Sequence, residues 1–289
     1  CSPADGERRL PMTTSRRRSN TRLHRIDLYP SENVKSVSLK GVRSYLQGLL
    51  PRVDVKIRGN LLRHQPRTEM MRLAEGFARA RVKNPAERLQ KSLPFPAEID
   101  YELRALGGSA RVGGVVYDGR IVQEILMNTI AEKASLDAQS IVFTDRLVST
   151  FSGDDLRHHL RYLVCGFPCI ISIPGIVEAP ARPREYYLLK QQIELEGGGD
   201  LRLEQLKSNF RGRFLDYGDP RIAEVLKGLS LQSVAYHTTL EPFCDVKSCR
   251  LFNAHWQEEL IRSQIIEGKL CRKHAPLFRS LGKSPVVAW

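Results

Sequence analysis

Residues 233–252 read SVAYHTTLEPFCDVKSCRLF, and residues 270–274 read LCRKH. In the first stretch four residues separate two cysteines, in the second two residues separate a cysteine from a histidine, and 21 residues lie between the pairs. Two pairs at these spacings can close a tetrahedral metal site, and Zn²⁺ both deprotonates thiols and fixes loops that bury little apolar surface. We therefore predict a Zn²⁺ site with four ligands, Cys244, Cys249, Cys271 and His274.

Basic side chains are frequent around these four positions, and a positive potential favours the thiolate form of cysteine. They are Lys247, Arg250, Lys269, Arg272 and Lys273. Two plainer interpretations stay open: the cysteines are small buried side chains, or only three of the four residues bind the metal.

Strand and helix patterns alternate along the chain before this segment. Residues 53–57 alternate as in a strand, and a helical apolar pattern in 34–50 links them to a strand-like run in 23–29. A second helical stretch, 121–134, lies among further strand-like runs. These runs are 112–117, 140–147, 162–165 and 169–173. The sequence predicts an α/β fold with a mixed, mostly parallel sheet flanked by helices.

The charge balance is strongly basic. The chain of 289 residues has 45 Lys and Arg against 32 Asp and Glu, a net charge of +13, which favours nucleic acid and other anionic partners. Residues 1–22 are rich in Arg, Ser and Thr without apolar periodicity, so we predict a disordered basic tail there. A single α/β domain, 23–289, follows and includes the zinc-binding segment 237–280. Because the chain opens at Cys1, Met12 is a candidate for the natural start.

The chain has no run of about 18 apolar residues, which predicts that no helix spans a membrane. The amino end lacks the apolar core of a signal peptide. We therefore expect a cytoplasmic protein with no membrane partner. In such a reducing compartment the six cysteines are not expected to form a disulfide framework, and the clustered ones are better explained as metal ligands.

The quoted segments resemble the carboxyl-terminal half of archaemetzincin, a metzincin-type zinc peptidase. That family reads H-E-x-x-H-x-x-G-x-x-H-C, then four residues and a second Cys, and ends with C-x-x-C; here His274 replaces the last cysteine. The stretches SIVFTDRLVSTFSG (140–153) and CIISIPGI (169–176) resemble the strands that precede the family's active-site helix. The resemblance implies a metzincin-like fold and a zinc metallopeptidase relative with a structural Cys3His zinc.

The catalytic motif of that family is degraded here. When the sequences are aligned on the first of these cysteines, Cys244, only the second metal-binding histidine survives, as His237. The first histidine, the glutamate, the glycine and the third histidine become Ser233, Val234, Leu240 and Phe243. The chemistry needs two histidines four residues apart and a glutamate that takes a proton from metal-bound water. The resemblance therefore implies weak or absent peptidase activity, a pseudoenzyme that binds a peptide or protein.

Two other functions stay open from the sequence. An active metal-dependent hydrolase could use His237, Glu241 and His255, since the first two lie four residues apart and the third follows in the next segment. In the plainer interpretation, His237 is a hydrogen-bonded histidine of the core. Glu241 then caps the end of the helix or is solvated there, and His255 packs against the zinc loop. A nucleic-acid-binding zinc protein is the other alternative, and the basic excess is its support.

Overall fold

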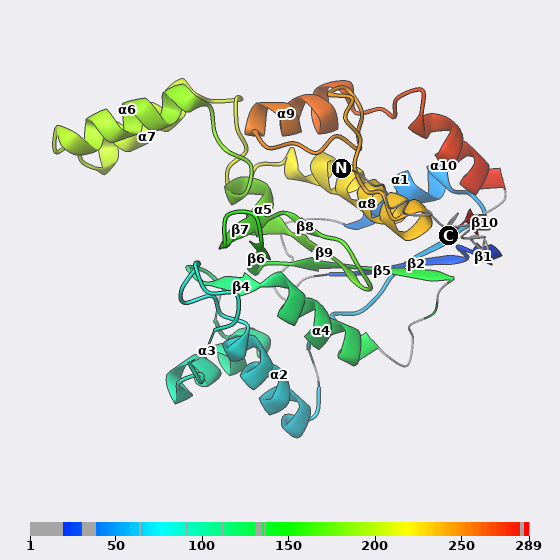
Figure 1. Cartoon of the computed structure of the whole chain (residues 1–289), viewed down its shortest axis with the longest axis horizontal. Coiled ribbons are helices and arrows are strands. Elements are labelled where there is room, and N and C mark those ends of the chain that lie inside the picture. Colours follow the sequence, from blue (N-terminus) through cyan, green and yellow to red (C-terminus); the bar gives the residue numbers. More distant parts are fainter. Residues whose placement is uncertain are drawn as a thin grey trace, which may run out of the picture.

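A five-stranded sheet lies at the centre of the protein in this computed structural model (Figure 1). The structure describes residues 20–30, 39–63, 65–90, 92–110, 112–130, 135, 137–283 and 286–288. The strand order is β3 (Asp54–Ile57), β2 (Arg25–Tyr29), β5 (Ala138–Thr144), β9 (Cys169–Ser172) and β8 (Leu163–Val164). All neighbours pair in parallel except β8, which runs antiparallel to β9. The predicted mixed, mostly parallel sheet is confirmed.

Helices cover both faces of this sheet because its strands alternate apolar residues toward each side. Ile26 and Leu28 of β2 belong to a core shared with α1 (Leu39–Leu49) and α8 (Ile222–Thr239). Tyr29 packs with the opposite core, which contains α2 (Arg67–Arg79) and α4 (Gly119–Ile130). Figure 1 shows α1 and α8 on one side of the sheet and α4 on the other. The predicted flanking helices are therefore confirmed.

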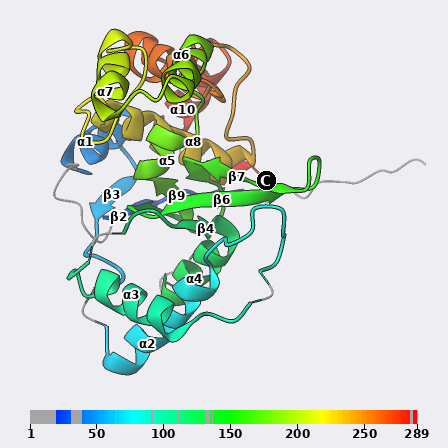
Figure 2. The same ribbon diagram turned by 90° about the vertical axis from the view of Figure 1, so that its left-hand side faces the viewer.

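Smaller elements complete the described part. A three-stranded sheet of order β4-β6-β7 adjoins the central one, and α3 lies beside α2 at the far side of α4 (Figure 2). Helices α6 and α7 form a hairpin that projects from the body, as Figure 1 shows. The bounds are β4 (Val116–Asp118), β6 (Leu147–Ser152), β7 (Arg157–Arg161), α3 (Pro96–Leu106), α5 (Ile173–Glu178), α6 (Arg184–Leu195) and α7 (Asp200–Asn209). The carboxyl-terminal elements are α9 (Gln257–Ile261), the π-helix η2 (Arg262–Glu267), α10 (His274–Lys283) and β10 (Val286–Ala288).

Most of the predicted basic tail lies outside the described residues, which begin at residue 20. Asn20–Arg22 form β1, which pairs antiparallel with β10. The nucleic-acid hypothesis, which depends on that tail, stays a prediction. Within the part that the structure describes, no helix is both long and apolar enough to cross a membrane.

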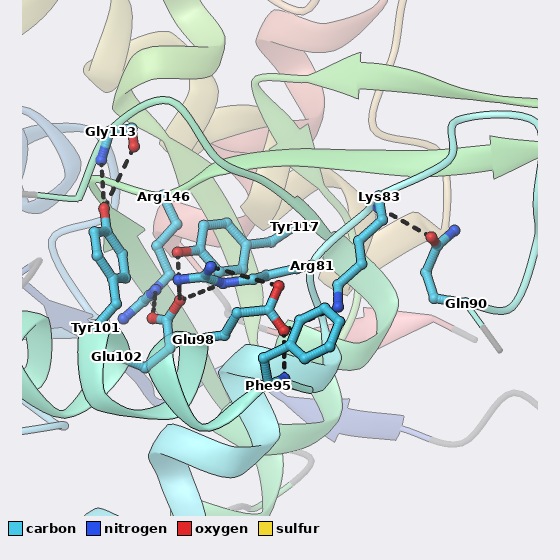
Figure 3. A network of polar contacts seen from close by, with 10 residues as sticks. All are labelled: Arg81, Lys83, Gln90, Phe95, Glu98, Tyr101, Glu102, Gly113, Tyr117 and Arg146. Atoms are coloured by element: carbon cyan, nitrogen blue, oxygen red, sulfur yellow. Dashed lines mark hydrogen bonds and ion pairs between the residues drawn. The ribbon is translucent and has the colours of Figure 1, made fainter. Parts of the chain in front are cut away.

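A buried charge network joins α3 to the second sheet (Figure 3). The Glu102 carboxylate is fully buried and accepts hydrogen bonds from Arg146 at 2.6 Å, from Arg81 at 2.7 Å and from the Tyr117 hydroxyl at 2.9 Å. The Arg146 guanidinium also lies 3.9 Å from the centre of the Phe77 ring. Burial raises the pKa of Tyr117, which keeps its phenol protonated as a donor. The network ties α2, α3 and β4 to the turn after β5.

We expect Glu102→Gln to destabilise the protein by about 3–5 kcal/mol, because it removes the carboxylate charge that faces the fully buried Arg146 guanidinium. Asp100→Asn is a matched control on the same helix, since the Asp100–Arg104 ion pair at 3.1 Å is largely exposed. That substitution should cost less than about 1 kcal/mol. Urea denaturation of both variants measures the difference, and equal costs would show that the buried network contributes nothing special.

Candidate metal centre

Helix α8 positions the first part of the centre. Its sequence is apolar on most sides, and 13 of its 18 residues are buried. The buried Ser233 hydroxyl accepts a hydrogen bond of 2.7 Å from Gln139 of β5, which fixes the helix against the sheet. The helix ends at Thr239, because Leu240 adopts a left-handed conformation with φ 61°. The chain therefore turns sharply just before the first cysteine.

Two loops and the start of a helix then meet. The Cys244 N–H donates to the carbonyl of Leu251 at 2.9 Å, which closes the first loop. The Arg250 N–H donates to the carbonyl of Lys269 at 2.8 Å, which brings the second loop alongside. Cys271 lies three residues before the first residue of α10, and its carbonyl accepts the His274 and Ala275 N–H groups at 3.1 and 2.9 Å. These backbone bonds bring all four predicted ligands to one place.

The ligand atoms of Cys244, Cys249, Cys271 and His274 all lie within 4.8 Å of one another. The Cys244 and Cys271 sulfurs are 3.9 Å apart, and His274 Nδ1 lies 3.7 Å from the Cys249 sulfur and 3.3 Å from that of Cys271. A regular tetrahedron with Zn–S of about 2.3 Å and Zn–N of about 2.0–2.1 Å has edges of about 3.8 Å between sulfurs and about 3.6 Å between sulfur and nitrogen. The four residues therefore fit a zinc ion.

Burial shapes the protonation of these ligands. It raises the pKa of the Cys249 thiol to about 12, so in the absence of a metal this thiol stays protonated at neutral pH. Burial also acts on Cys271, but the backbone N–H groups of His274 and Lys273 outweigh it and lower the pKa of that thiol. Burial, aided by the Lys273 charge, lowers the pKa of His274 and favours the neutral imidazole that binds metals. The cluster thus combines one thiol whose pKa is lowered, Cys271, with one whose pKa is raised, Cys249, and a metal ion must deprotonate the second.

A buried arginine holds the first loop to the helix behind it. Arg250 is 2% exposed, and its guanidinium bonds to the Glu224 carboxylate and, at 3.2 Å, to the carbonyl of Gln264. The Gln264 amide in turn donates to the carbonyl of Arg250 at 2.8 Å. Gly228 of α8 lies against this pair, and a Cβ there would overlap the Gln264 side-chain oxygen. Sequence reasoning missed this positioning role, since neither a motif nor a spacing marks Gln264 or Gly228.

The basic side chains expected to favour thiolates have other partners in several cases. The Arg250 charge faces Glu224, while Lys247 lies 3.5 Å from Glu259 and Lys269 lies 3.4 Å from Glu267. These acidic partners therefore weaken the positive electrostatic potential that the three basic side chains produce at the cysteine sulfurs. Backbone N–H groups near Cys271 lower its pKa more directly.

The three residues considered for a hydrolytic site are not part of the Cys3His cluster, although Glu241 lies close enough to His274 for its charge to act on that imidazole. His237 is fully buried in α8, where its ring meets the edge of Phe167 at a centroid distance of 5.3 Å. Glu241 and His255 are exposed on the loops after α8 and before α9. In the described part of the chain, the group of potential ligands close enough to share a metal is the Cys3His cluster alone. The structure thus does not bring these three side chains together as a metal site.

Comparison with known proteins gives a family and two similar structures. The family described as "Probable metallopeptidase family (DUF6775)" matches residues 22–281. Among proteins with curated functions, none matches the sequence. An archaemetzincin from Methanopyrus kandleri is 11% identical, with 90% of this chain and 96% of that chain covered and a TM-score of 0.44. A zinc-dependent peptidase from Methanocorpusculum labreanum is 14% identical, with 88% and 99% covered and a TM-score of 0.40.

We expect Gly228→Ala to destabilise the protein by about 1–3 kcal/mol, because the added methyl displaces Gln264 from its bond to the metal loop. Gly48→Ala in the exposed part of α1 is the matched control, since a Cβ there has nothing within 4 Å. That helix substitution should be neutral or stabilise by up to about 1 kcal/mol. Thermal and urea denaturation measure both; a neutral Gly228→Ala would contradict the close packing.

Proposed function

The chain belongs to the probable metallopeptidase family, and on this basis we propose that it is a zinc-binding relative of peptidases in which the zinc is structural and the family's hydrolytic chemistry is lost. The observation that carries the proposal is the cluster of three sulfurs and one imidazole within 4.8 Å. A tetrahedral zinc ion with four protein ligands has no open position for water, and this is the arrangement of structural sites. A zinc ion bound there would cross-link the loop of Cys244 and Cys249 to the segment of Cys271 and His274.

The residues around the degraded motif support the loss of hydrolysis. At the position where the resemblance puts the first histidine, Ser233 is fully buried and bonded to Gln139. At the position of the catalytic glutamate, Val234 is fully buried in the apolar core. Neither supplies the imidazole ligand or the carboxylate base that this mechanism needs. A positioned general base typically contributes roughly 10²–10⁴-fold, so this mechanism fails without it.

A peptide or a protein segment is the partner that we propose, by analogy with the substrates of peptidases. A cytoplasmic location belongs to the same proposal, because a cluster of free thiols persists as metal ligands in a reducing compartment. The His237, Glu241 and His255 hydrolase remains the competing hypothesis, and it requires a second metal ion. Counting metal ions separates the two.

We expect one zinc per chain in the purified protein by elemental analysis. Cys249→Ser should remove it, because the loss of one buried thiolate opens the site. Cys165→Ser is the matched control, a free cysteine outside the cluster, and should retain one equivalent, as should His237→Ala. Two equivalents in the unaltered protein, one of them lost in His237→Ala, would overturn the structural role and favour the hydrolase.

We also expect no peptide hydrolysis by the zinc-loaded protein. Incubation with a mixture of unstructured peptides, followed by mass spectrometry, should give no products above a zinc-free buffer control. Cleavage that disappears in both His237→Ala and Glu241→Gln would contradict the proposal. Cleavage unchanged in both variants would identify a contaminating peptidase, and repurification would then have to remove it for the proposal to hold.

A further inference from the structure

A cavity of about 410 Å³ opens beside the carboxyl end of α8, separate from the Cys3His cluster. Residues from α4, β7, β8, the end of α8 and the loop before α9 line it. Its volume lies in the range of about 300–1,000 Å³ that is usual for ligand sites. The walls that matter for recognition are Arg120, Arg161, Tyr162, Tyr236, Phe243 and His255.

The charge of this lining is one-sided. Arg120 and Arg161 line the cavity, and no aspartate or glutamate is among the described residues that do. The Arg161 Nε donates to the Thr150 hydroxyl at 2.8 Å, which orients that guanidinium within the cavity wall. A cavity with two cationic side chains and no carboxylate attracts an anion.

Two acidic side chains near residues of this lining have partners of their own. The Asp118 carboxylate is buried and accepts the backbone N–H of Arg120 at 2.8 Å. Glu259 lies 3.5 Å from Lys247 and accepts the backbone N–H of His255 at 3.2 Å. Neither lines the cavity. The positive potential of the two arginines is thus available to a ligand.

The side chains that line the cavity indicate which class of ligand it binds. Guanidinium groups bind carboxylates through paired, charge-assisted hydrogen bonds of fixed geometry. Leu160, Tyr236 and Phe243 add apolar surface that can take an aliphatic side chain next to the anionic group. Asn253 and His255 supply polar groups at the same wall. A carboxylate attached to a short, partly apolar chain matches this combination.

We propose that this cavity binds a peptide through a carboxylate, with Arg120 and Arg161 as the residues that select it. The peptide character rests on the proposed function, whereas the preference for a carboxylate rests on the cavity itself. The carboxylate belongs either to the end of the peptide or to an acidic side chain. The two sources share one chemistry, and separate probes distinguish them.

The test is isothermal titration calorimetry of the zinc-loaded full chain with three probes: acetyl-trialanine, its carboxyl-terminal amide, and acetyl-Ala-Asp-Ala-amide. We expect at least one carboxylate probe to bind about tenfold or more tightly than the trialanine amide, as a charge-assisted contact implies. Arg120→Gln and Arg161→Gln should each reduce that preference. Arg43→Gln, which removes the same charge from an exposed position of α1, is the matched control and should leave it unchanged.

Equal binding of the three probes, or no binding at millimolar concentration, would overturn the proposal, and so would an equal loss in Arg43→Gln. Mass spectrometry of the same mixtures keeps the proposed function separate. Cleaved probes would contradict the loss of hydrolysis, while the order of affinities would still decide the carboxylate preference. Zinc analysis of each variant shows that the arginines act on the ligand and not on the metal.

Discussion

The burial of α8 is the constraint on which the rest of the structure depends. A helix covered on most sides must satisfy each polar side chain internally, since an unpaired buried polar group costs about 1–3 kcal/mol. Ser233 meets this need through Gln139 of β5, and Gln232 donates to the carbonyl of Phe252 at 3.1 Å. The first bond fixes α8 against the central sheet, and the second fixes the loop that carries Cys244 and Cys249 against α8. The position of the Cys3His cluster therefore depends on the orientation of α8 against the sheet.

The loops that carry the cysteines place Leu251 in the core but leave Phe243 and Val246 exposed, so part of the energy that holds these loops must come from polar contacts and from a metal ion. A single neutral hydrogen bond contributes about 0.5–1.5 kcal/mol, and one that involves a charged group, such as the Arg250 guanidinium, contributes about 1.5–3 kcal/mol. Structural zinc in small peptides binds with an apparent free energy of about 10–16 kcal/mol, which exceeds the sum of those bonds. The protein scaffold thus aligns the ligands and the ion would supply most of the cohesion. The buried Arg250 contributes to this alignment through its bonds to Glu224 and to the carbonyl of Gln264.

Local patterns predicted the parts of the fold that depend on neighbours in sequence. The spacing of the cysteines pointed to a cluster, and alternation in 53–57 gave β3 almost to the residue. Features that depend on distant residues gave no signal. Glu102 and Arg146 are 44 positions apart, and nothing in either segment marks them as partners. Leucine has no preference for the left-handed conformation, so the end of α8 before Leu240 could not be predicted from the sequence. No sequence pattern marks the change from α9 to the π-helix η2 either, although Gln264 of η2 donates to the carbonyl of Arg250.

In the proposed function, the loss of catalysis and the retention of a ligand site are physically separable. A second metal site on α8 would need an imidazole in place of Ser233 and a carboxylate in place of Val234, both fully buried. The first change breaks the bond to Gln139, and the second puts a charge into an apolar core, where an unpaired ion is costly. One substitution cannot restore the chemistry without damage to the helix that supports the fold. The cavity at the end of α8 is formed by other side chains, so it can select a peptide whether or not the helix ever regains a catalytic ion.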